Sequence, residues 1–292
     1  MDIVITYVDG NDVEWKKDYE KYADEPVMQK RFRDWGTLKY LLRGIECKMP
    51  FVRNVYLVVS HSTQVPDWVN QDVLKVVLHS DIIPSEFLPV FNSTAIEMFL
   101  HKIDGLDEQY IYFNDDLFPV GDFHPDDFFP GGKITTGFRK HILASGMYKK
   151  QCRNSDHMAR KALGMKPGLC FIRPQHVCSP MLKSQCAALY DKMEKEILAT
   201  VTRLRTDYNL NQYVFLDYMY YNGNVVPGKI SNRHFSVAVA GADRIAQFIR
   251  KPDRKLCCIN DVHLSEEKFS RMRDIIIQAF EDVFPSKSRF EK

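Results

Sequence analysis

Short apolar runs alternate with amphipathic segments in the chain up to residue 114. The runs are continuous in Val, Ile, Leu and aromatic residues, which is typical of strands buried on both faces of a sheet. Four strands are predicted in this way, at residues 2–8, 53–60, 73–79 and 109–114. Two helices are predicted from apolar residues at helical spacing, at 37–48 and at 92–103, the second with Thr94 and Glu97 placed as a capping box. This alternation predicts a doubly wound α/β sheet.

The rest of the chain has a more helical pattern. Residues 179–204 predict a long helix with one break, and residues 214–226 predict a helix that turns into a strand. A late strand is expected at 254–261. Residues 267–284 predict an amphipathic helix that is stopped by Pro285. Because no repeat and no Gly- or Ser-rich linker interrupts the sequence, we expect one compact unit with a helical lobe added to the sheet.

Composition and charge exclude several classes of function. The 292 residues are 45% hydrophobic, as in an ordinary globular protein. A formal net charge of +2 provides little electrostatic attraction to the phosphates of a nucleic acid, which is therefore not expected as a partner. The seven cysteines include no CxxC pair, which favours reduced thiols over disulfides or structural zinc. No apolar run has the length of a membrane span, and the N-terminus lacks the basic region of a signal peptide.

Three predicted strands end in polar residues. The first is followed by Asp9-Gly10-Asn11-Asp12, the strand at 109–114 leads into Asn114-Asp115-Asp116, and the late strand ends in Asn260-Asp261. If these strands run parallel, their carboxyl ends bring the side-chain oxygens to one edge. Such oxygens suit Mg²⁺ or Mn²⁺, whose usual partner in an enzyme is a diphosphate. The alternative for Asn114-Asp115-Asp116 is a strand that ends in an Asx-turn.

Basic residues suited to a phosphate surround one predicted helix. Arg33 precedes the helix at 37–48, and Lys39 and Arg43 lie one turn apart on it. The alternative is a solvated helix face.

Residues 203–207 and His176 offer the remaining candidates. Arg203 and Arg205 precede a turn and suit a bidentate phosphate clamp, whereas the alternative is a surface ion pair with Asp207. His176 lies in a loop flanked by prolines, where an imidazole can act as a general base near neutral pH. The alternative is an ordinary surface or core histidine.

Four motifs span nearly the whole chain. They are DIVITYVDGND; FRDWGTLKYLLRGIE through LPVFNSTAIEMFLHKIDGL to YIYFNDDLF; RPQHVCSPM followed by TVTRLRTDYNLNQY; and LCCINDVHLSEEKF, closing with FPSKSRFEK. In this order they resemble the four blocks of the Stealth family of sugar-1-phosphate transferases. That family includes bacterial capsular polysaccharide phosphotransferases and the catalytic part of the lysosomal-enzyme GlcNAc-1-phosphotransferase. The chain departs from the family at Tyr7, where Trp is usual, and in the distance of Pro180 from His176.

The resemblance implies a Rossmann-like, glycosyltransferase-A-like fold with a mostly parallel sheet and an added helical lobe. It implies a single catalytic domain over residues 1–292, in which 1–150 bind the nucleotide sugar and 151–292 form the helical lobe and the C-terminal part of the active site. The implied reaction transfers a hexose-1-phosphate or N-acetylhexosamine-1-phosphate from a UDP-sugar to a hydroxyl of a saccharide or lipid-linked glycan acceptor. UMP is released and a phosphodiester forms, in capsule or exopolysaccharide synthesis.

The resemblance also implies roles for the candidate residues. His176 or Asp116 is the base that takes the acceptor proton, and Arg205 stabilises the charge on the phosphoryl oxygens. A divalent metal, Mg²⁺ or Mn²⁺, is expected on Asp115, Asp116 and Asp261. Substrate binding is expected at Asp9 and Gly10 in the nucleotide pocket, at Arg33, Asp34, Lys39 and Arg43 on the donor side, at Asn92, Ser93 and Glu97 near a helix N-terminus, and at Asn114 and Asn260 at two strand ends.

Three other functions compete with this one. A metal-dependent glycosyltransferase would release UDP instead of UMP. A haloacid-dehalogenase-like phosphatase needs a second Asp two residues after the first, where Val4 stands, and is discounted. A non-catalytic saccharide-binding module would use Trp15, Trp35 or Trp68 to stack on sugars, but it does not need carboxylates at several strand ends.

The lack of a predicted span or signal leads us to expect a bacterial cytoplasmic enzyme with at most peripheral contact with the inner face of the membrane. The segment 267–284, followed by Lys287, Arg289 and Lys292, either rests on a membrane surface or packs on the domain.

Overall fold

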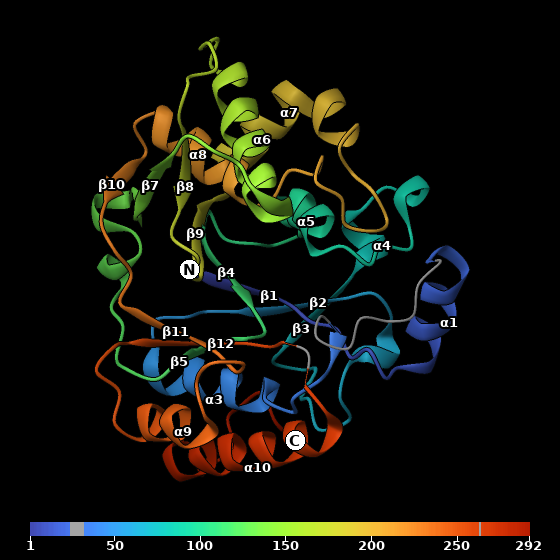
Figure 1. Ribbon diagram of the computed structural model, residues 1–292, viewed down its shortest axis with the longest axis vertical. Coiled ribbons are helices and arrows are strands. Elements are labelled where there is room, and N and C mark those ends of the chain that lie inside the picture. Colours follow the sequence, from blue (N-terminus) through green and yellow to red (C-terminus); the bar gives the residue numbers. More distant parts are fainter. Residues whose placement is uncertain (24–31, 263) are drawn as a thin grey trace. The chain divides into compact units, whose positions relative to one another are not determined.

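The computed structural model describes residues 1–23, 32–262 and 264–292 (Figure 1). The chain divides into two compact units. Unit 1 consists of residues 1–4, 77–112 and 125–230, and unit 2 consists of residues 5–76, 113–124 and 231–292. The single catalytic domain expected over 1–292, with its parts 1–150 and 151–292, stays a prediction.

The largest sheet has five strands in the order β3-β2-β1-β4-β9. Its strands are β1 (Asp2–Thr6), β2 (Val55–Val59), β3 (Lys75–Leu78), β4 (Gln109–Asn114) and β9 (Ser179–Leu182). All five residues of β2 are buried, as expected for a strand covered on both faces. β9 runs antiparallel to β4, with Tyr110 opposite Met181. The predicted α/β class with a mostly parallel sheet is confirmed.

Unit 1 is rich in helices. They are α4 (His79–Ile82), α5 (Ser93–Ile96), the 3-10 segment Glu97–Lys102, α6 (Gly146–Ala162), α7 (Lys183–Leu198) and α8 (Tyr213–Tyr221). α6 packs along α8, and both contact β8 (Phe171–Pro174). β8 pairs antiparallel with β7 (Phe138–His141), and β6 (Ile134–Thr136) pairs in parallel with β10 (Val225–Pro227). These helices lie partly outside the range 151–292 in which the helical lobe is expected, so the place of that lobe stays a prediction.

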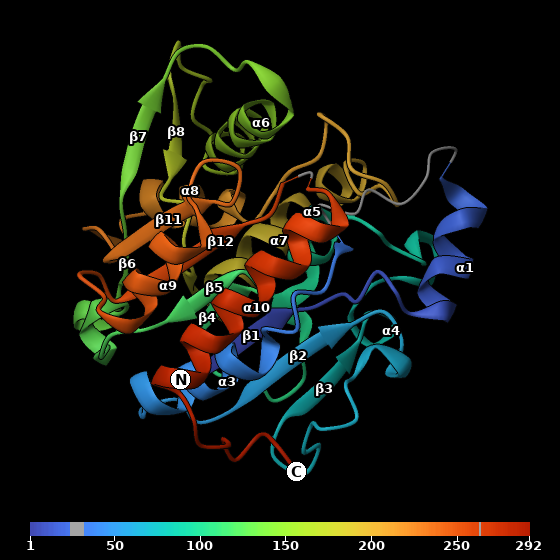
Figure 2. The same cartoon turned by 60° about the horizontal axis from the view of Figure 1, so that its bottom comes forward.

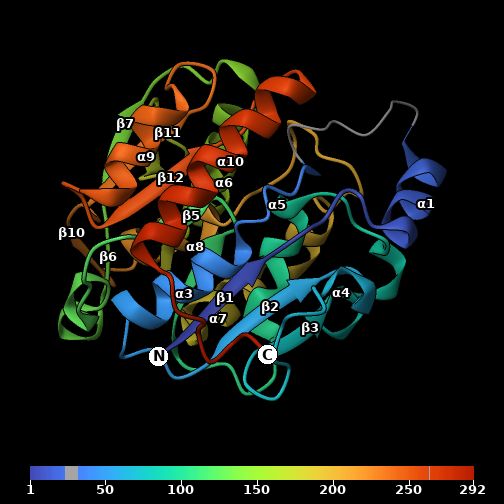
Figure 3. The ribbon, with the colours of Figure 1, turned by 90° about the horizontal axis from the view of Figure 1, so that it is seen from below.

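Unit 2 contains a three-stranded sheet in the order β11-β12-β5. The strands of this sheet are β5 (Leu117–Pro119), β11 (Asn232–Ser236) and β12 (Leu256–Asn260). The helices of unit 2 include α1 (Val13–Tyr22), α3 (Leu38–Lys48), α9 (Ala242–Arg250) and α10 (Glu266–Val283). α9 and α10 lie side by side (Figure 3). α10 begins after Ser265, whose hydroxyl accepts from Lys268 N, and it buries Ile276 and Phe280. Phe280 stacks on Tyr40 of α3, so this helix uses its apolar face for packing within the unit rather than for a membrane.

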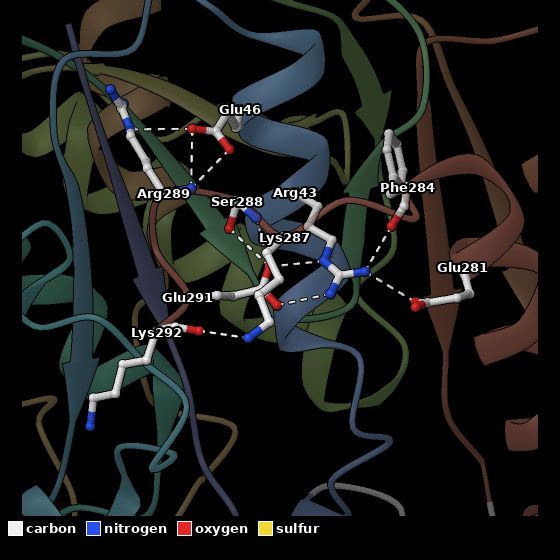
Figure 4. A network of polar contacts seen from close by, with 9 residues as sticks. All are labelled: Arg43, Glu46, Glu281, Phe284, Lys287, Ser288, Arg289, Glu291 and Lys292. Carbon is white, nitrogen blue, oxygen red and sulfur yellow. Dashed lines mark hydrogen bonds and ion pairs between the residues drawn. The ribbon is translucent and has the colours of Figure 1, made fainter.

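Arg43 of α3 holds the C-terminal residues of the chain in place (Figure 4). Its Nε and Nη2 donate to the two carboxylate oxygens of Glu291 at 2.8 and 2.9 Å. Its Nη1 donates to Glu281 Oε2 at 3.1 Å and to the Phe284 carbonyl at 2.7 Å. All three of its nitrogens are used inside the fold, and a role of Arg43 on the donor side stays a prediction.

Two local expectations differ from the structure. The helix that begins at Ser93 has no capping box, because Asn92 is the cap and its Oδ1 accepts from Thr94 N at 3.2 Å. The segment 179–204 starts as β9 and becomes helical only at Lys183, with its expected break at Met193. No helix in the described part of the chain is long and apolar enough to cross a bilayer.

Candidate active site

The polar ends of β1, β4 and β12 do not meet at the edge of one sheet, which is where the sequence predicts them. β1 and β4 belong to the five-stranded sheet, whereas β12 belongs to another sheet, so one sheet edge does not unite all three ends. After β4, Asp115 and Asp116 instead form a turn into β5, which pairs with β12. The Asp116 carbonyl accepts from Ile259 N at 2.9 Å, and the Cys258 thiol donates to Asp116 Oδ2 at 3.6 Å. Asp116 is thereby anchored to the strand that ends in Asn260.

Four acidic side chains of unit 2 influence one another electrostatically: Asp9, Asp34, Asp115 and Asp116, here called the carboxylate cluster. Burial raises the pKa of Asp115 to about 8, and the charges of Asp116 and Asp34 add to the effect. Burial raises the pKa of Asp116 to about 6. Burial also raises the pKa of Asp34, with a further contribution from Asp9. Like charges in a poorly solvated place favour a bound proton or a cation.

The first motif positions Asp34 through a close backbone contact. Gly10 N donates to the Phe32 carbonyl at 2.7 Å, and a Cβ on Gly10 would lie only 2.4 Å from that oxygen. Glycine therefore allows the segment after Phe32 to approach the end of β1. Tyr7 is hydrogen-bonded to the Asp34 carboxylate, which also accepts from Gly36 N at 2.8 Å. Contact of Gly10 with a nucleotide stays a prediction.

The carboxylate cluster fits a divalent cation that is shared with a substrate. Asp116 Oδ1 is buried and has no hydrogen-bond partner among the residues that the structure describes. Within the same residues, no three His, Cys, Asp or Glu side chains are placed to hold a metal ion by themselves. Mg²⁺ is often bound by one or two carboxylates together with the phosphates of its substrate. Asp115 and Asp116 match that kind of site.

Arg33 and Asp261 influence each other at another part of unit 2. Burial raises the pKa of Asp261, and this is opposed by hydrogen bonds from Trp35 Nε1 at 3.1 Å and from Val262 N at 2.6 Å and by the charge of Arg33. Arg33 Nη2 lies 3.6 Å from the carboxylate of Glu266. Its Nη1 is buried and has no hydrogen-bond partner within residues 1–23, 32–262 and 264–292. Arg33 therefore keeps a donor for an anion, while Asp261 as a metal ligand stays a prediction.

In unit 1, Arg205 is held by the start of α5. Its Nη2 donates to Ser93 Oγ, and its Nε donates to Asn92 Oδ1 at 3.4 Å. Asn92 is itself 1% exposed and accepts from the backbone N–H of Thr94. Asn92 and Ser93 thus hold the Arg205 guanidinium in place, and their contact with a phosphate stays a prediction.

Glu97 is a buried carboxylate beside the same arginine. Its Oε2 accepts from Gln212 N at 2.7 Å, and its Oε1 accepts from Tyr112 Oη at 3.4 Å. Burial raises the pKa of Glu97 to about 7, whereas the Gln212 hydrogen bond and the charge of Arg205 lower it. Glu97 therefore accepts a hydrogen bond from the segment before α8 and interacts electrostatically with Arg205. Its direct contact with substrate stays a prediction.

His176 begins a chain of hydrogen-bonding side chains in unit 1. Its Nδ1 lies 3.1 Å from Tyr213 Oη, which lies 2.9 Å from Tyr148 Oη. Tyr148 is in turn hydrogen-bonded to the Cys152 thiol. Tyr213 is 1% exposed, and burial raises its pKa well above 10, so its hydroxyl stays protonated. When His176 Nδ1–H donates to Tyr213, the lone pair of the imidazole lies on Nε2, as a general base requires.

Three tyrosines of these clusters were not among the residues expected from the sequence: Tyr7, Tyr148 and Tyr213. Tyr7 carried a usable signal, because it lies two residues before Asp9, and residues two apart in an extended segment share a face. Tyr213 closes the third motif, but nothing in the sequence pairs it with His176, and Tyr148 lies outside the four motifs. Asn114 and Asn260 end β4 and β12 as expected. Lys39 Nζ lies 4.8 Å from the Tyr40 ring, and its role toward the donor stays a prediction.

The chain is similar to proteins of known class. Residues 31–136 match the family model described as Stealth protein CR2, conserved region 2. The receptor polysaccharide phosphotransferase WefC of Streptococcus gordonii is 30% identical over 100% of this chain and 98% of its own length. The capsular polysaccharide phosphotransferase WcwK of Streptococcus pneumoniae is 29% identical over 100% of this chain and 99% of its own. Among solved structures, the galactosyltransferase LgtC aligns with 95% of this chain and 96% of its own at 10% identity and a TM-score of 0.41. The similarity to WefC over the whole length shows that the chain belongs to the Stealth family of sugar-phosphate transferases.

Proposed function

We propose that this enzyme transfers a hexose-1-phosphate or N-acetylhexosamine-1-phosphate from a UDP-sugar to a hydroxyl of a saccharide or lipid-linked glycan. The acceptor oxygen forms a bond to the phosphorus nearest the sugar. The bond from that phosphorus to the bridging oxygen of the diphosphate breaks, so UMP leaves with the oxygen and the sugar keeps its phosphate. The acceptor proton passes to a base of the enzyme, and a phosphodiester results. The polysaccharide phosphotransferase names of the relatives support this class of product.

The observation that carries the proposal is the turn formed by Asp115 and Asp116. Two adjacent carboxylates with raised pKa values, one of them with a buried oxygen that lacks a hydrogen bond among the described residues, are costly unless a cation or a proton meets them. A diphosphate that arrives with a divalent cation would satisfy both groups. A saccharide-binding module has no use for such a pair, so the turn favours catalysis over simple binding.

Mg²⁺ or Mn²⁺ held by Asp115 and Asp116 would neutralise the diphosphate and assist departure of UMP. Because the pKa of Asp115 is about 8, this carboxyl group releases its proton before it can serve as a ligand near neutral pH. The buried Nη1 of Arg33 is suited to donate to a phosphate oxygen.

His176 and Asp116 are the two candidates for the base that takes the acceptor proton. The contact with Tyr213 favours His176, because it fixes the orientation of the ring and the nitrogen that carries the lone pair. Arg205, which Ser93 and Asn92 orient, would stabilise the charge that develops on the phosphoryl oxygens.

The nucleotide product tests the proposal. The purified protein is incubated with UDP-GlcNAc, UDP-Glc or UDP-Gal, a saccharide acceptor and Mg²⁺ or Mn²⁺, and UMP is separated from UDP. We expect UMP only when the acceptor is present. Asp116→Asn and His176→Ala should each lower the rate by about 100-fold or more, in the range found for general bases.

Asp122→Asn and His124→Ala are matched controls, because both residues are exposed on unit 2. They should leave the rate unchanged. Formation of UDP instead of UMP would mean transfer of the sugar without its phosphate and would overturn the proposed reaction. Equal activity in wild type and Asp116→Asn would remove the carboxylate turn from the mechanism.

We further propose that the reaction takes place in a bacterial cytoplasm. The named relatives come from streptococci. All seven cysteines are free thiols, as expected in a reducing compartment.

A further inference from the structure

Exposed apolar side chains are concentrated in one stretch of unit 1. Among the residues that the structure describes, six of the eleven large apolar side chains that are exposed lie between Ile142 and Leu169. Ile142 is 71% exposed, Leu143 is 78% exposed and Leu169 is 94% exposed. Single exposed apolar residues are normal on a protein surface, but a group of them marks an interaction site.

The pairing of β7 and β8 brings these residues to one end of the strands. His141, the last residue of β7, lies opposite Phe171, the first residue of β8. The chain therefore leaves β7 and enters β8 at the same end, as Figure 2 shows. Ile142 and Leu143 follow β7, and Leu169 precedes β8. We call this surface, residues 142–147 and 165–170, the β7–β8 tip.

The tip is surrounded by positive charge. Residues 133–173 hold ten of the 40 Lys and Arg residues of the chain but only one of its 38 Asp and Glu residues. That single acid, Asp156, is buried and accepts from Arg160. Two of the other cations form ion pairs with acids outside this stretch, Lys150 with Asp207 and Lys161 with Glu196. Arg139 lies opposite Arg173 in the β7–β8 pair, an arrangement of like charges that is unfavourable without an external anion.

Three of these basic side chains lie close enough to His141, the last residue of β7, to influence its pKa. Burial lowers its pKa, and the charges of Arg173, Lys149 and Arg139 lower it further. Three cationic side chains therefore act on one position at the end of β7. The tip combines a basic surface with apolar residues that protrude from it.

We propose that the β7–β8 tip docks on a bilayer that contains anionic lipids. Ile142, Leu143 and Leu169 would enter the boundary between headgroups and acyl chains, and Arg139 and Lys140 would face the lipid phosphates. Apolar side chains among basic residues are the usual means by which a protein lies on such a surface. A nucleic acid would match the charge but offers no apolar phase to protruding aliphatic side chains.

The position of the tip also agrees with the proposed function, and the agreement depends on that function. α6 starts at Gly146 in the tip, and its Tyr148 is hydrogen-bonded to Tyr213, the partner of His176. A docked tip would therefore bring the proposed base close to a membrane surface. An acceptor carried on a lipid would be available there.

Flotation of the whole protein with vesicles tests the proposal. We expect binding to vesicles of phosphatidylcholine mixed with phosphatidylglycerol, weaker binding at high salt, and little binding to phosphatidylcholine alone. Lys140→Gln with Lys166→Gln should lower the partition coefficient about fivefold for each charge lost. Leu143→Ser with Leu169→Ser should abolish flotation.

Val239→Ser and Lys251→Gln are matched controls from unit 2, since Val239 is 86% exposed and Lys251 is exposed. They should float like wild type, and thermal melting shows that each variant is folded. No flotation of wild type, or tip variants that float as well as wild type, would overturn the proposal. Self-association that the tip variants abolish would do so as well, because a second copy would then cover the tip. None of these readouts needs catalysis, so they do not depend on the identity of the nucleotide product.

Discussion

The hydroxyl of Tyr213 is a single group on which the proposed role of His176 depends. It lies 3.1 Å from His176 Nδ1, and its burial keeps it protonated. We expect Tyr213→Phe to lower kcat about 10- to 100-fold and to change the acid limb of the pH–rate profile, because the imidazole loses the partner that fixes its tautomer. The KM for the donor should change little.

Tyr208→Phe is the control for this substitution, because Tyr208 is 78% exposed. It should leave both the rate and the pH profile as in wild type. A Tyr213→Phe enzyme with a reduced rate but an unchanged pH profile would indicate a purely structural role for the hydroxyl.

The raised pKa of Asp115 predicts how stability depends on pH. In the unfolded chain this carboxyl group loses its proton near pH 4, whereas in the folded protein it keeps the proton up to about pH 8. The folded state therefore binds more protons between these values, and the metal-free protein should lose stability as pH rises through this window. Asp115→Asn should reduce that slope and raise Tm at pH 8.

Thermal melting in the presence of EDTA, at several pH values across this window, measures the effect. Added Mg²⁺ should raise the Tm of wild type more at the upper end of the window than at the lower end, because a ligand carboxylate must be deprotonated. Asp122→Asn, at an exposed position, should keep the slope of wild type. Parallel curves for Asp115→Asn and wild type would contradict the assignment.

At the scale of elements, the contact of Gly10 with Phe32 joins the end of β1 to the segment that carries Asp34. A Cβ at Gly10 would lie 2.4 Å from the Phe32 carbonyl oxygen, which is shorter than a van der Waals contact. We expect Gly10→Ala to cost about 1–3 kcal/mol of stability, as overpacking usually does, and to lower activity by displacing Asp34. Gly241→Ala is the control, because nothing lies within 4 Å of its added Cβ. Equal Tm values for the two variants would show that the contact can relax without cost.

Elements with a strong apolar pattern were predictable, and elements without one were not. The buried strand β4 matches its predicted range 109–114, and α10 matches its predicted range within one residue at each end. α6 was missed because its buried positions include Gln151, Ser155 and Asp156, which give no apolar period. The carboxylate turn after β4 was visible as two acids after an apolar run. The contact of Tyr213 with His176 was not, because 37 residues separate the two.

At the scale of the whole chain, the decisive contacts join residues that no local pattern relates. Arg43 and Glu291 are separated by 248 positions, yet they form a paired hydrogen bond that fastens the C-terminal residues to α3. From the sequence alone, an arginine on a helix near the first motifs suggested a phosphate ligand. The structure shows that its charge is already compensated, which is a property of the folded chain and not of the helix.

This contact gives a prediction for stability that also separates it from donor binding. The side chains of Arg43 and Glu291 are 5% and 6% exposed, so Arg43→Ala leaves a nearly buried carboxylate without its partner. We expect the free energy of unfolding to fall by about 3–5 kcal/mol and the Tm to fall by roughly 6–10 °C.

Arg43→Met combined with Glu291→Leu removes both charges and should cost less stability than the single change, with an unaltered KM for the donor. Arg250→Ala, which breaks an exposed pair with Asp282, should cost at most about 1 kcal/mol. An Arg43→Ala protein as stable as Arg250→Ala would show that the pair does not hold the C-terminal residues, and a raised donor KM in the double variant would return Arg43 to the donor site.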